Sequence, residues 1–274
     1  MTSTADGATS EAMTAHTAPN ICAIYGDFAD GSGGKFLGGG TLIGLGDRTW
    51  VLTANHVLYE RNDPQYRVIA VSQDEGTEPY VLGPEFFGWA GVLDLGAVPL
   101  GSDYVSASKR PVPAGRLGKN SRGVEEGIFF VQGFPPPPEA TPRSSFPSIV
   151  GSRSVPVLTG PAAVRNIGWF DPRRHFALDY SGSDLVHGDG GHADWKQPRG
   201  FSGSAVWAVN GGADVEGWTP DRSRIVGVVT DHGEDDQVLV AVRIEIVRKF
   251  LRTTLCHRFA RRSCADLRAL LSLW

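Results

Sequence analysis

The sequence has few cysteines and no long apolar runs. Only three of its 274 residues are cysteines, namely Cys22, Cys256 and Cys264. So few thiols, odd in number, argue against a disulfide framework and favour a reducing compartment. No apolar run approaches the roughly 18 residues that a membrane-spanning helix needs, and the N-terminus lacks the pattern of a secretion signal. We expect a cytoplasmic protein without a membrane partner; a secreted protein whose signal was removed is the alternative.

An excess of charge of one sign is also missing, because 26 basic and 30 acidic residues leave a net charge of −4. This balance is that of a folded globular protein and argues against general binding of nucleic acid. Basic residues do gather in the C-terminal segment 243–262. They could dock an acidic partner, but a solvated helix face is the interpretation we favour.

Short apolar runs separated by glycine dominate residues 21–244. The runs are rich in Val, Ile, Leu and aromatic residues and are bounded by turn formers, which is typical of an all-β sandwich or barrel. A Pro-, Gly- and base-rich break at 109–122 divides them into two similar halves. The predicted strands are 21–25, 41–45, 50–53, 67–71, 92–99, 127–132, 155–158, 164–170, 204–209, 224–230 and 238–244.

The two ends of the chain depart from this strand pattern. Residues 1–19 are rich in Thr, Ala and Ser, and we expect them to form a disordered tail. After residue 244 the period becomes helical, and one apolar stripe should pack on the β body. That stripe consists of Val247, Leu251, Leu255 and Phe259. A capping box at 263–266 predicts a second short helix.

Three local motifs carry residues suited to hydrolytic chemistry. His56 follows a glycine-rich strand and a second apolar run. Asp94 lies within the apolar run 92–99, where a carboxylate is costly to bury unless a donor such as a histidine N–H faces it. Ser202 stands between glycines in the turn 200–203, which exposes the hydroxyl and aims amide N–H groups at one point. Each motif alone is weak evidence of a site.

The order of the three residues along the chain is more specific. The order His, Asp, Ser distinguishes the chymotrypsin arrangement from those of subtilisin and the α/β-hydrolases. The chain resembles the trypsin/chymotrypsin-like serine peptidases in segments 39–43, 53–56, 94–97, 131–135, 200–203 and 225–229. The resemblance implies an all-β fold of two antiparallel β-barrels of chymotrypsin type, with a C-terminal helix and a second short helix. The implied parts are 20–118, 119–244 and 245–274, after the tail 1–19.

The resemblance also implies a role for each residue of the three motifs. Ser202 Oγ would attack the scissile carbonyl of a protein or peptide substrate, and His56 would take its proton and pass it to the leaving amine. Asp94 would hold the imidazole in the correct tautomer. The amide N–H groups of Gly200 and Ser202 would form the oxyanion hole. No metal or organic cofactor is required.

The chain departs from the family at several places. Phe201 stands where trypsin carries an aspartate that pairs with a newly cut N-terminus, so that mode of zymogen activation is not expected. Val57 and Gly38 stand where many secreted members carry a bridging cysteine pair. Both departures favour an intracellular, bacterial-type relative. Because an always-active cytoplasmic peptidase would threaten its host, we expect activity to be gated by a regulatory partner, a ligand or a loop.

Specificity is predicted from offsets to Ser202. Lys196 and Gln197 would lie near the base of the primary substrate pocket, with Thr230 and His232 along a wall. A positive pocket would favour an acidic residue before the cut. The alternative is that these loop residues face solvent.

Two further interpretations stay open. The segment 187–194 contains two histidines and two aspartates, but its spacing matches no established zinc or calcium site, and a solvated loop is favoured. The protein could also be a catalytically silent binding or scaffold module on the same fold, or an esterase-like hydrolase with the same triad.

Overall fold

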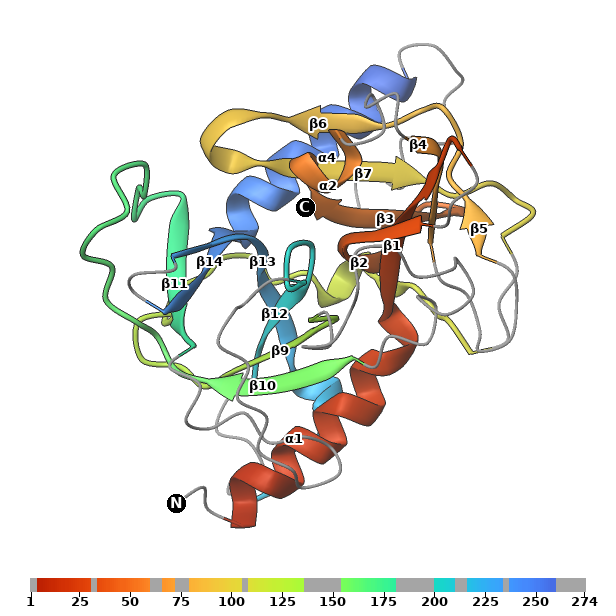
Figure 1. Ribbon diagram of the computed structural model, residues 1–274. Helices are drawn as coiled ribbons and strands as arrows, with labels where there is room; N and C mark the ends of the chain where they lie inside the picture. The colour runs from red at the N-terminus through yellow and green to blue at the C-terminus, as the bar shows by residue number, and fades with distance from the viewer. Residues whose placement is uncertain are drawn as a thin grey trace.

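Two β-sheets, formed by successive halves of the chain, are the main elements of the computed structural model (Figure 1). The described residues are 4–30, 34–59, 66–71, 79–104, 108–135, 154–180, 200–209, 216–233 and 237–259. No helix within these ranges is both long enough and apolar enough to cross a bilayer.

The first sheet has eight strands in the order β5-β4-β1-β2-β3-β7-β6, with β8 paired to β2. Its strands are β1 (Ile21–Phe28), β2 (Gly34–Leu45), β3 (Arg48–Ala54), β4 (Tyr66–Val71), β5 (Tyr80–Val81), β6 (Phe87–Trp89), β7 (Leu95–Pro99) and β8 (Val112–Pro113). Neighbours pair antiparallel, except for the short parallel pairing of β8 with β2.

Both faces of the first sheet are buried, which explains why its strands are apolar at consecutive positions. Leu42 and Val51 point into a cluster enclosed by this sheet. Their chain neighbours Ile43 and Leu52 point to the opposite face and join the largest apolar cluster, which includes residues of the second sheet and of the C-terminal helix. Successive side chains of a strand point to opposite faces of the sheet. One set of residues therefore fills the core of the first sheet, and the other set packs that sheet against the second one.

The second sheet has six strands in the order β10-β9-β12-β13-β14-β11, all paired antiparallel. They are β9 (Phe129–Gly133), β10 (Val155–Thr159), β11 (His175–Asp179), β12 (Ala205–Ala208), β13 (Arg224–Gly233) and β14 (Val238–Arg243). Every predicted run overlaps a strand of the structure except 164–170, for which that prediction is wrong. Ile167 and Trp169 in that run belong to a loop that packs on a cluster formed by β11 and β14. Their apolar character therefore reflects packing on a sheet and not membership of a strand.

The N-terminal segment forms a helix, and the prediction of a disordered tail at 1–19 is wrong. Helix α1 (Thr4–Thr17) is followed by a turn of 3-10 helix, Ala18–Asn20, that leads into β1. Met13 is fully buried in the largest apolar cluster, and the Thr17 hydroxyl lies 2.5 Å from Gln132 Oε1 on β9. Alanine favours helix, and one buried face is enough to fix this segment against β9 and β10 (Figure 1).

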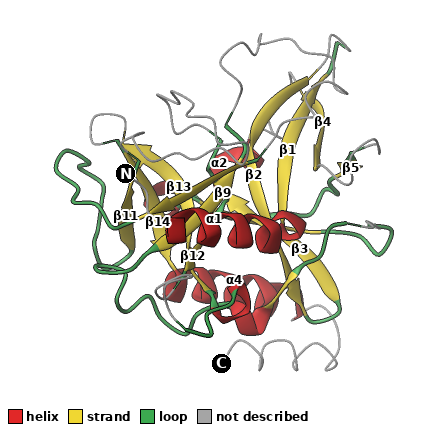
Figure 2. Cartoon of the chain, turned by 90° about the horizontal axis from the view of Figure 1, so that it is seen from below, coloured by secondary structure: helices red, strands yellow, loops and turns green. Residues whose placement is uncertain are grey.

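Two other helices follow strands directly, one in the first half of the chain and one at the end of the second sheet. The short α2 (Asn55–Tyr59) follows β3 directly, and α4 (Ile244–Phe259) follows β14. Val247, Leu251 and Leu255 are fully buried, as the predicted stripe requires. Figure 2, seen from below, shows α1 and α4 running across the strands. The second C-terminal helix, predicted from the capping box at 263–266, lies outside the described residues.

Candidate active site

His56 and Asp94 form a close pair. The imidazole Nδ1 lies 2.5 Å from Asp94 Oδ2, and the backbone N–H of His56 donates to Asp94 Oδ1 at 2.9 Å. Asn55 adds a backbone bond from its N–H to the Asp94 carbonyl oxygen at 2.7 Å. The first turn of α2 therefore binds both the side chain and the main chain of Asp94.

Asp94 occupies a tight turn and not a strand, which corrects the interpretation of 92–99 as one continuous strand. A 3-10 turn, Gly91–Leu93, ends at Asp94, whose φ of 43° lies in the left-handed region, and β7 starts only at Leu95. This backbone strains a residue with a side chain, at a cost of about 1 kcal/mol. In this conformation both carboxylate oxygens of Asp94 face His56.

This geometry determines which nitrogen of His56 can act as a base. Because Nδ1 faces a carboxylate oxygen, the neutral ring carries its proton there, and Nε2 keeps its lone pair. The His56 side chain is 52% exposed and that of Asp94 is 22% exposed. The imidazole thus presents a basic nitrogen to an accessible face while its other nitrogen is held by a less exposed anion.

The predicted turn at 200–203 has the backbone that its glycines allow. Gly200 and Gly203 have φ of 92° and 89°, respectively. A Cβ on Gly200 would overlap the carbonyl group of Phe134, and one on Gly203 would overlap the Gly39 carbonyl oxygen. The turn is closed by a bond from Ser204 N–H to the Phe201 carbonyl oxygen at 2.9 Å. No other residue type would fit these two positions without moving the backbone.

The turn lies directly on the first sheet. Gly39 N–H donates to the Ser202 carbonyl oxygen at 2.9 Å. A Cβ on Gly38 would meet Val57 Cγ2 at 2.6 Å and the Ser202 carbonyl oxygen at 3.5 Å. Ser202 and Val57, which follows His56, therefore lie side by side across Gly38. The two sheets bring the Ser202 turn beside the helix that carries His56.

Ser202 itself is partly exposed. Within the described ranges its hydroxyl makes no hydrogen bond, to His56 or to any other residue. In the same part of the chain, the amide N–H groups of Gly200 and Ser202 have no acceptor. The turn therefore presents a hydroxyl and two N–H donors that are not used by the fold.

Phe201 anchors the turn in the second sheet. Its ring is fully buried and makes an edge-on contact with Tyr180, with 5.6 Å between ring centroids. Gly133 on β9 lies so close that a Cβ there would be 2.5 Å from the Phe201 ring. Burial raises the pKa of the Tyr180 hydroxyl to about 12, so the phenol beside Phe201 stays uncharged at neutral pH. An apolar side chain thus anchors the turn in the second sheet.

The predicted pocket residues divide into two groups. Thr230 is 1% exposed and sits at a register shift of β13, a bulge of the kind that reorients side chains beside binding sites. His232 follows on the same strand, and its N–H donates to Asp231 Oδ1 at 2.7 Å. Lys196 and Gln197 lie outside the described residues, so the preference for an acidic residue before the cut stays a prediction.

The segment 187–194 also lies outside the described residues, so the favoured interpretation of a solvated loop stays a prediction. Among the residues that are described, no group of three or more His, Cys, Asp or Glu side chains is arranged to hold a metal ion.

Sequence reasoning missed one residue beside the site. His175, the first residue of β11, is fully buried, and its Nε2 lies 2.8 Å from the carbonyl oxygen of Val92. Val92 belongs to the turn that ends at Asp94. A histidine followed by the apolar residues 176–178 was the available signal, because a buried imidazole requires polar partners.

No protein-family model matches the sequence, and no curated protein matches it. Among solved structures, HL collagenase is similar, with 13% sequence identity and a TM-score of 0.53, over 86% of this chain and 93% of that chain. The HtrA-type protease AlgW, solved with a decapeptide, is 14% identical with a TM-score of 0.52, over 88% of this chain and 66% of that chain. The chain thus spans slightly less than two thirds of AlgW.

These likenesses confirm the predicted fold class, an all-β chymotrypsin-type fold with a C-terminal helix. Both similar structures are proteases, so the chain has the fold of a protease. Identity of 13–14% shows the fold alone, and the chemistry has to be argued from this chain's own residues.

Proposed function

We propose that the protein is a serine endopeptidase that hydrolyses peptide bonds through an acyl-enzyme, with Ser202 as nucleophile, His56 as general base and Asp94 as the residue that orients it. The observation that carries the proposal is the His56–Asp94 pair beside the glycine turn of Ser202. A fold requires neither a carboxylate that binds one histidine through both of its oxygens nor a serine turn with unused N–H donors.

The chemistry follows from the free lone pair on His56 Nε2. As Ser202 Oγ attacks the substrate carbonyl carbon, Nε2 accepts the hydroxyl proton, and Asp94 stabilises the imidazolium that forms. The carbonyl oxygen becomes an oxyanion, which the N–H groups of Gly200 and Ser202 bind. Nε2 then protonates the leaving amine, and water releases the acyl group by the same steps. Catalytic hydrogen bonds are often long without substrate, so the unbonded Ser202 hydroxyl is compatible with this role.

The buried ring of Phe201 supports a second part of the proposal. Since an apolar anchor holds the turn, no ion pair with a cut N-terminus is needed to shape the oxyanion hole. Control of activity then comes from a regulatory protein partner, a ligand or a loop. Purified protein that cleaves generic unfolded substrates at full rate by itself would contradict this second part and leave the first intact.

The first part is tested with a fluorophosphonate probe, which reacts with activated serine hydroxyls. We expect the probe to label the wild-type protein on Ser202, by peptide mapping, and to leave Ser202→Ala unlabelled. Ser204→Ala is the matched control, because it removes a hydroxyl two residues away on the same turn, and it should label like wild type.

The alternatives differ in their results. A folded wild-type protein that is labelled neither when purified nor in whole-cell lysate, where a partner or ligand would be present, would indicate a silent binding or scaffold module. Labelling with hydrolysis of small esters, but no peptide cleavage, would indicate an esterase-like hydrolase. Proteome-wide mapping of new N-termini with wild type and Ser202→Ala should reveal cleavages that depend on Ser202.

A further inference from the structure

His175 has a defined protonation state. Its Nδ1 accepts the backbone N–H of Asp171 at 3.2 Å, and its Nε2 lies 2.8 Å from the Val92 carbonyl oxygen. Because Nδ1 faces a donor and Nε2 an acceptor, the neutral ring carries its proton on Nε2 and donates it to Val92. Burial lowers the pKa of His175, which supports the neutral form. The ring lies against Trp169 and Phe170, with centroid distances of 5.4 and 5.8 Å.

The acceptor of that bond belongs to the turn of Asp94. Val92 lies in the segment Gly91–Leu93, which ends at the left-handed Asp94. A strained backbone of this kind persists only where its surroundings hold it. Asn55 and His56 hold the Asp94 side of the turn from within the first sheet's half of the chain. His175 holds the Val92 side from the second sheet.

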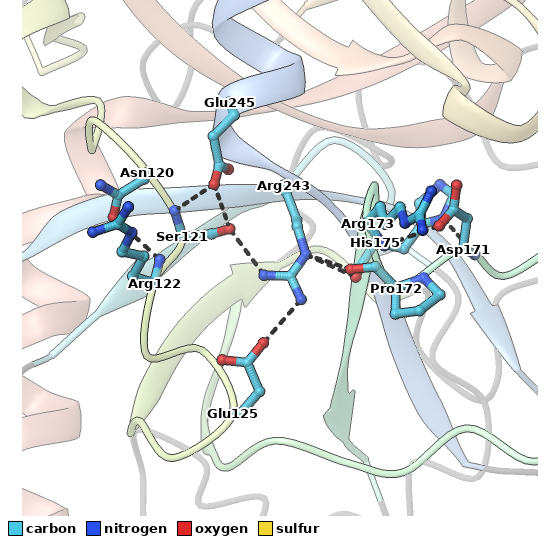
Figure 3. Close-up of polar contacts among 10 residues, drawn as sticks. All are labelled: Asn120, Ser121, Arg122, Glu125, Asp171, Pro172, Arg173, His175, Arg243 and Glu245. Carbon is cyan, nitrogen blue, oxygen red and sulfur yellow. Dashed lines mark hydrogen bonds and ion pairs between the residues drawn. The ribbon is translucent and has the colours of Figure 1, made fainter.

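A hydrogen-bond network in turn fixes His175 (Figure 3). The Arg243 guanidinium donates from Nε to the carbonyl oxygens of Pro172 and His175, at 2.9 and 3.1 Å. It also donates from Nη1 to Ser121 Oγ and from Nη2 to Glu125 Oε1, each at 3.0 Å. One arginine on β14 thus joins the backbone that carries His175 to the segment 121–125.

We propose that His175 is a positioning residue for the hydrolytic reaction: by donating from Nε2 to the Val92 carbonyl oxygen, it holds the turn in which the Asp94 carboxylate meets His56. The second sheet thereby sets the orientation of a base that the first sheet carries. The proposal rests on the proposed function only for its kinetic consequence, since the coupling of His175 to the His56–Asp94 pair can be measured without any reaction.

The test compares His175→Phe with His175→Gln. Phenylalanine fills the space between Trp169 and Phe170 but has no N–H, whereas glutamine places an amide N–H near the position of Nε2. Two properties are measured: the second-order rate of fluorophosphonate labelling, and the strongly downfield NMR resonance of the His56 Nδ1 proton. The matched control is Thr159→Val, which removes a hydroxyl that donates to the Asp179 carbonyl oxygen at 2.6 Å, also on β11.

We expect His175→Phe to lower the labelling rate about tenfold or more, because small displacements of catalytic groups cost up to ~100-fold, and to shift or broaden the Nδ1 resonance. His175→Gln should restore most of both. Thr159→Val should lower the melting temperature without changing either. A wild-type rate and an unchanged resonance in folded His175→Phe would overturn the proposal. If wild type is not labelled at all, the proposed function fails, and the resonance still decides the coupling.

A second variant covers the case in which His175→Phe does not fold. Arg243→Gln loosens the backbone at 172–175 and leaves the His175 ring in place. We expect it to lower the labelling rate several-fold and to shift the His56 Nδ1 resonance in the same direction. Glu125→Gln, which keeps an acceptor for Arg243, is its control. Arg243→Gln with wild-type rate and resonance would overturn the proposal.

Discussion

Gly39 donates its backbone N–H to the carbonyl oxygen of Ser202 at 2.9 Å, so the proposed nucleophile turn is joined to the first sheet through main-chain atoms. Two threonine hydroxyls reinforce this junction. Thr53 Oγ1 donates to the Gly39 carbonyl oxygen at 2.7 Å, and Thr41 Oγ1 donates to that of Gly203 at 3.1 Å. The relative position of the base and the nucleophile therefore depends on close backbone approach between the sheets.

Gly203→Ala should break this junction. The new Cβ would have a left-handed backbone and would overlap the Gly39 carbonyl oxygen, and it would lie 2.5 Å from Thr53 Oγ1. We expect a loss of a few kcal/mol in the free energy of unfolding, since strain of about 1–2 kcal/mol adds to the overlap. Fluorophosphonate labelling should fall at least ~100-fold, because the turn must move away from His56.

Gly217→Ala separates the energetic cost of backbone strain from the cost of steric overlap. Gly217 also has a positive φ, 70°, but a Cβ there would meet nothing closer than Arg222 Nη1 at 4.0 Å. Urea unfolding should show a loss of only about 1–2 kcal/mol, with labelling unchanged. Equal losses in the two variants would show that Gly203 is required for its φ alone and not for contact with Gly39.

Much of the fold follows from the sequence because its strands are apolar and its turns are rich in glycine. Strands β1, β2 and β3 are predictable since both faces of their sheet are buried, which leaves continuous apolar runs. The run 164–170 carries the same composition and forms no strand, because a loop that packs on a sheet also needs apolar residues. Helix α1 was missed because it buries one narrow face, around Met13, in an otherwise polar segment.

The candidate site could be predicted in part for similar reasons. Ser202 lies in a turn with two glycines of positive φ, and His56 follows a clearly apolar strand. Both features are visible in the neighbouring sequence. The left-handed conformation of Asp94 leaves none, since nothing in residues 92–99 shows where the turn ends and β7 begins. His175 acts across the two sheets, and a contact of that kind cannot be inferred from neighbours in the chain.

Asp94→Asn tests the role of the carboxylate. An amide at this position can turn its NH₂ group toward His56 Nδ1, which would favour the tautomer with the proton on Nε2 and remove the base. We expect the rate of peptide hydrolysis to fall by about 10⁴-fold with little change in stability. Asp103→Asn is the control, because Asp103 Oδ1 accepts a bond from the Tyr80 hydroxyl at 3.0 Å away from the site. A residual rate near wild type in Asp94→Asn would exclude the proposed role.

Met13→Ala tests the finding that the N-terminal segment is part of the fold. Met13 is fully buried in the largest apolar cluster, and truncation of such a side chain costs about 2–5 kcal/mol. Glu11→Ala changes an exposed position on the same helix and should stay within ±0.5 kcal/mol. Urea unfolding measures both. If the two variants were equally stable, α1 would contribute nothing to the folded state.

Acid should destabilise the protein through two histidines. Burial lowers the pKa of His175, and burial together with Arg116 lowers the pKa of His16 against the opposing effect of Asp221. In the unfolded chain both titrate near pH ~6.5, so below that pH the unfolded state binds protons that the folded state does not. The free energy of unfolding should therefore fall as pH drops below about 6.5, until the lowered folded-state pKa values are reached.

Carboxylates contribute their own acid dependence, so the slope has to be compared between variants. Urea unfolding between pH 5 and 8 should give a shallower slope for His175→Gln than for wild type, and a shallower one still when His16→Asn is added. Thr159→Val, which changes no titratable group, provides the control and should leave the slope unchanged. If His175→Gln kept the full wild-type slope, protons would reach His175 equally well in the folded and unfolded states, and the buried, neutral imidazole described here would be wrong.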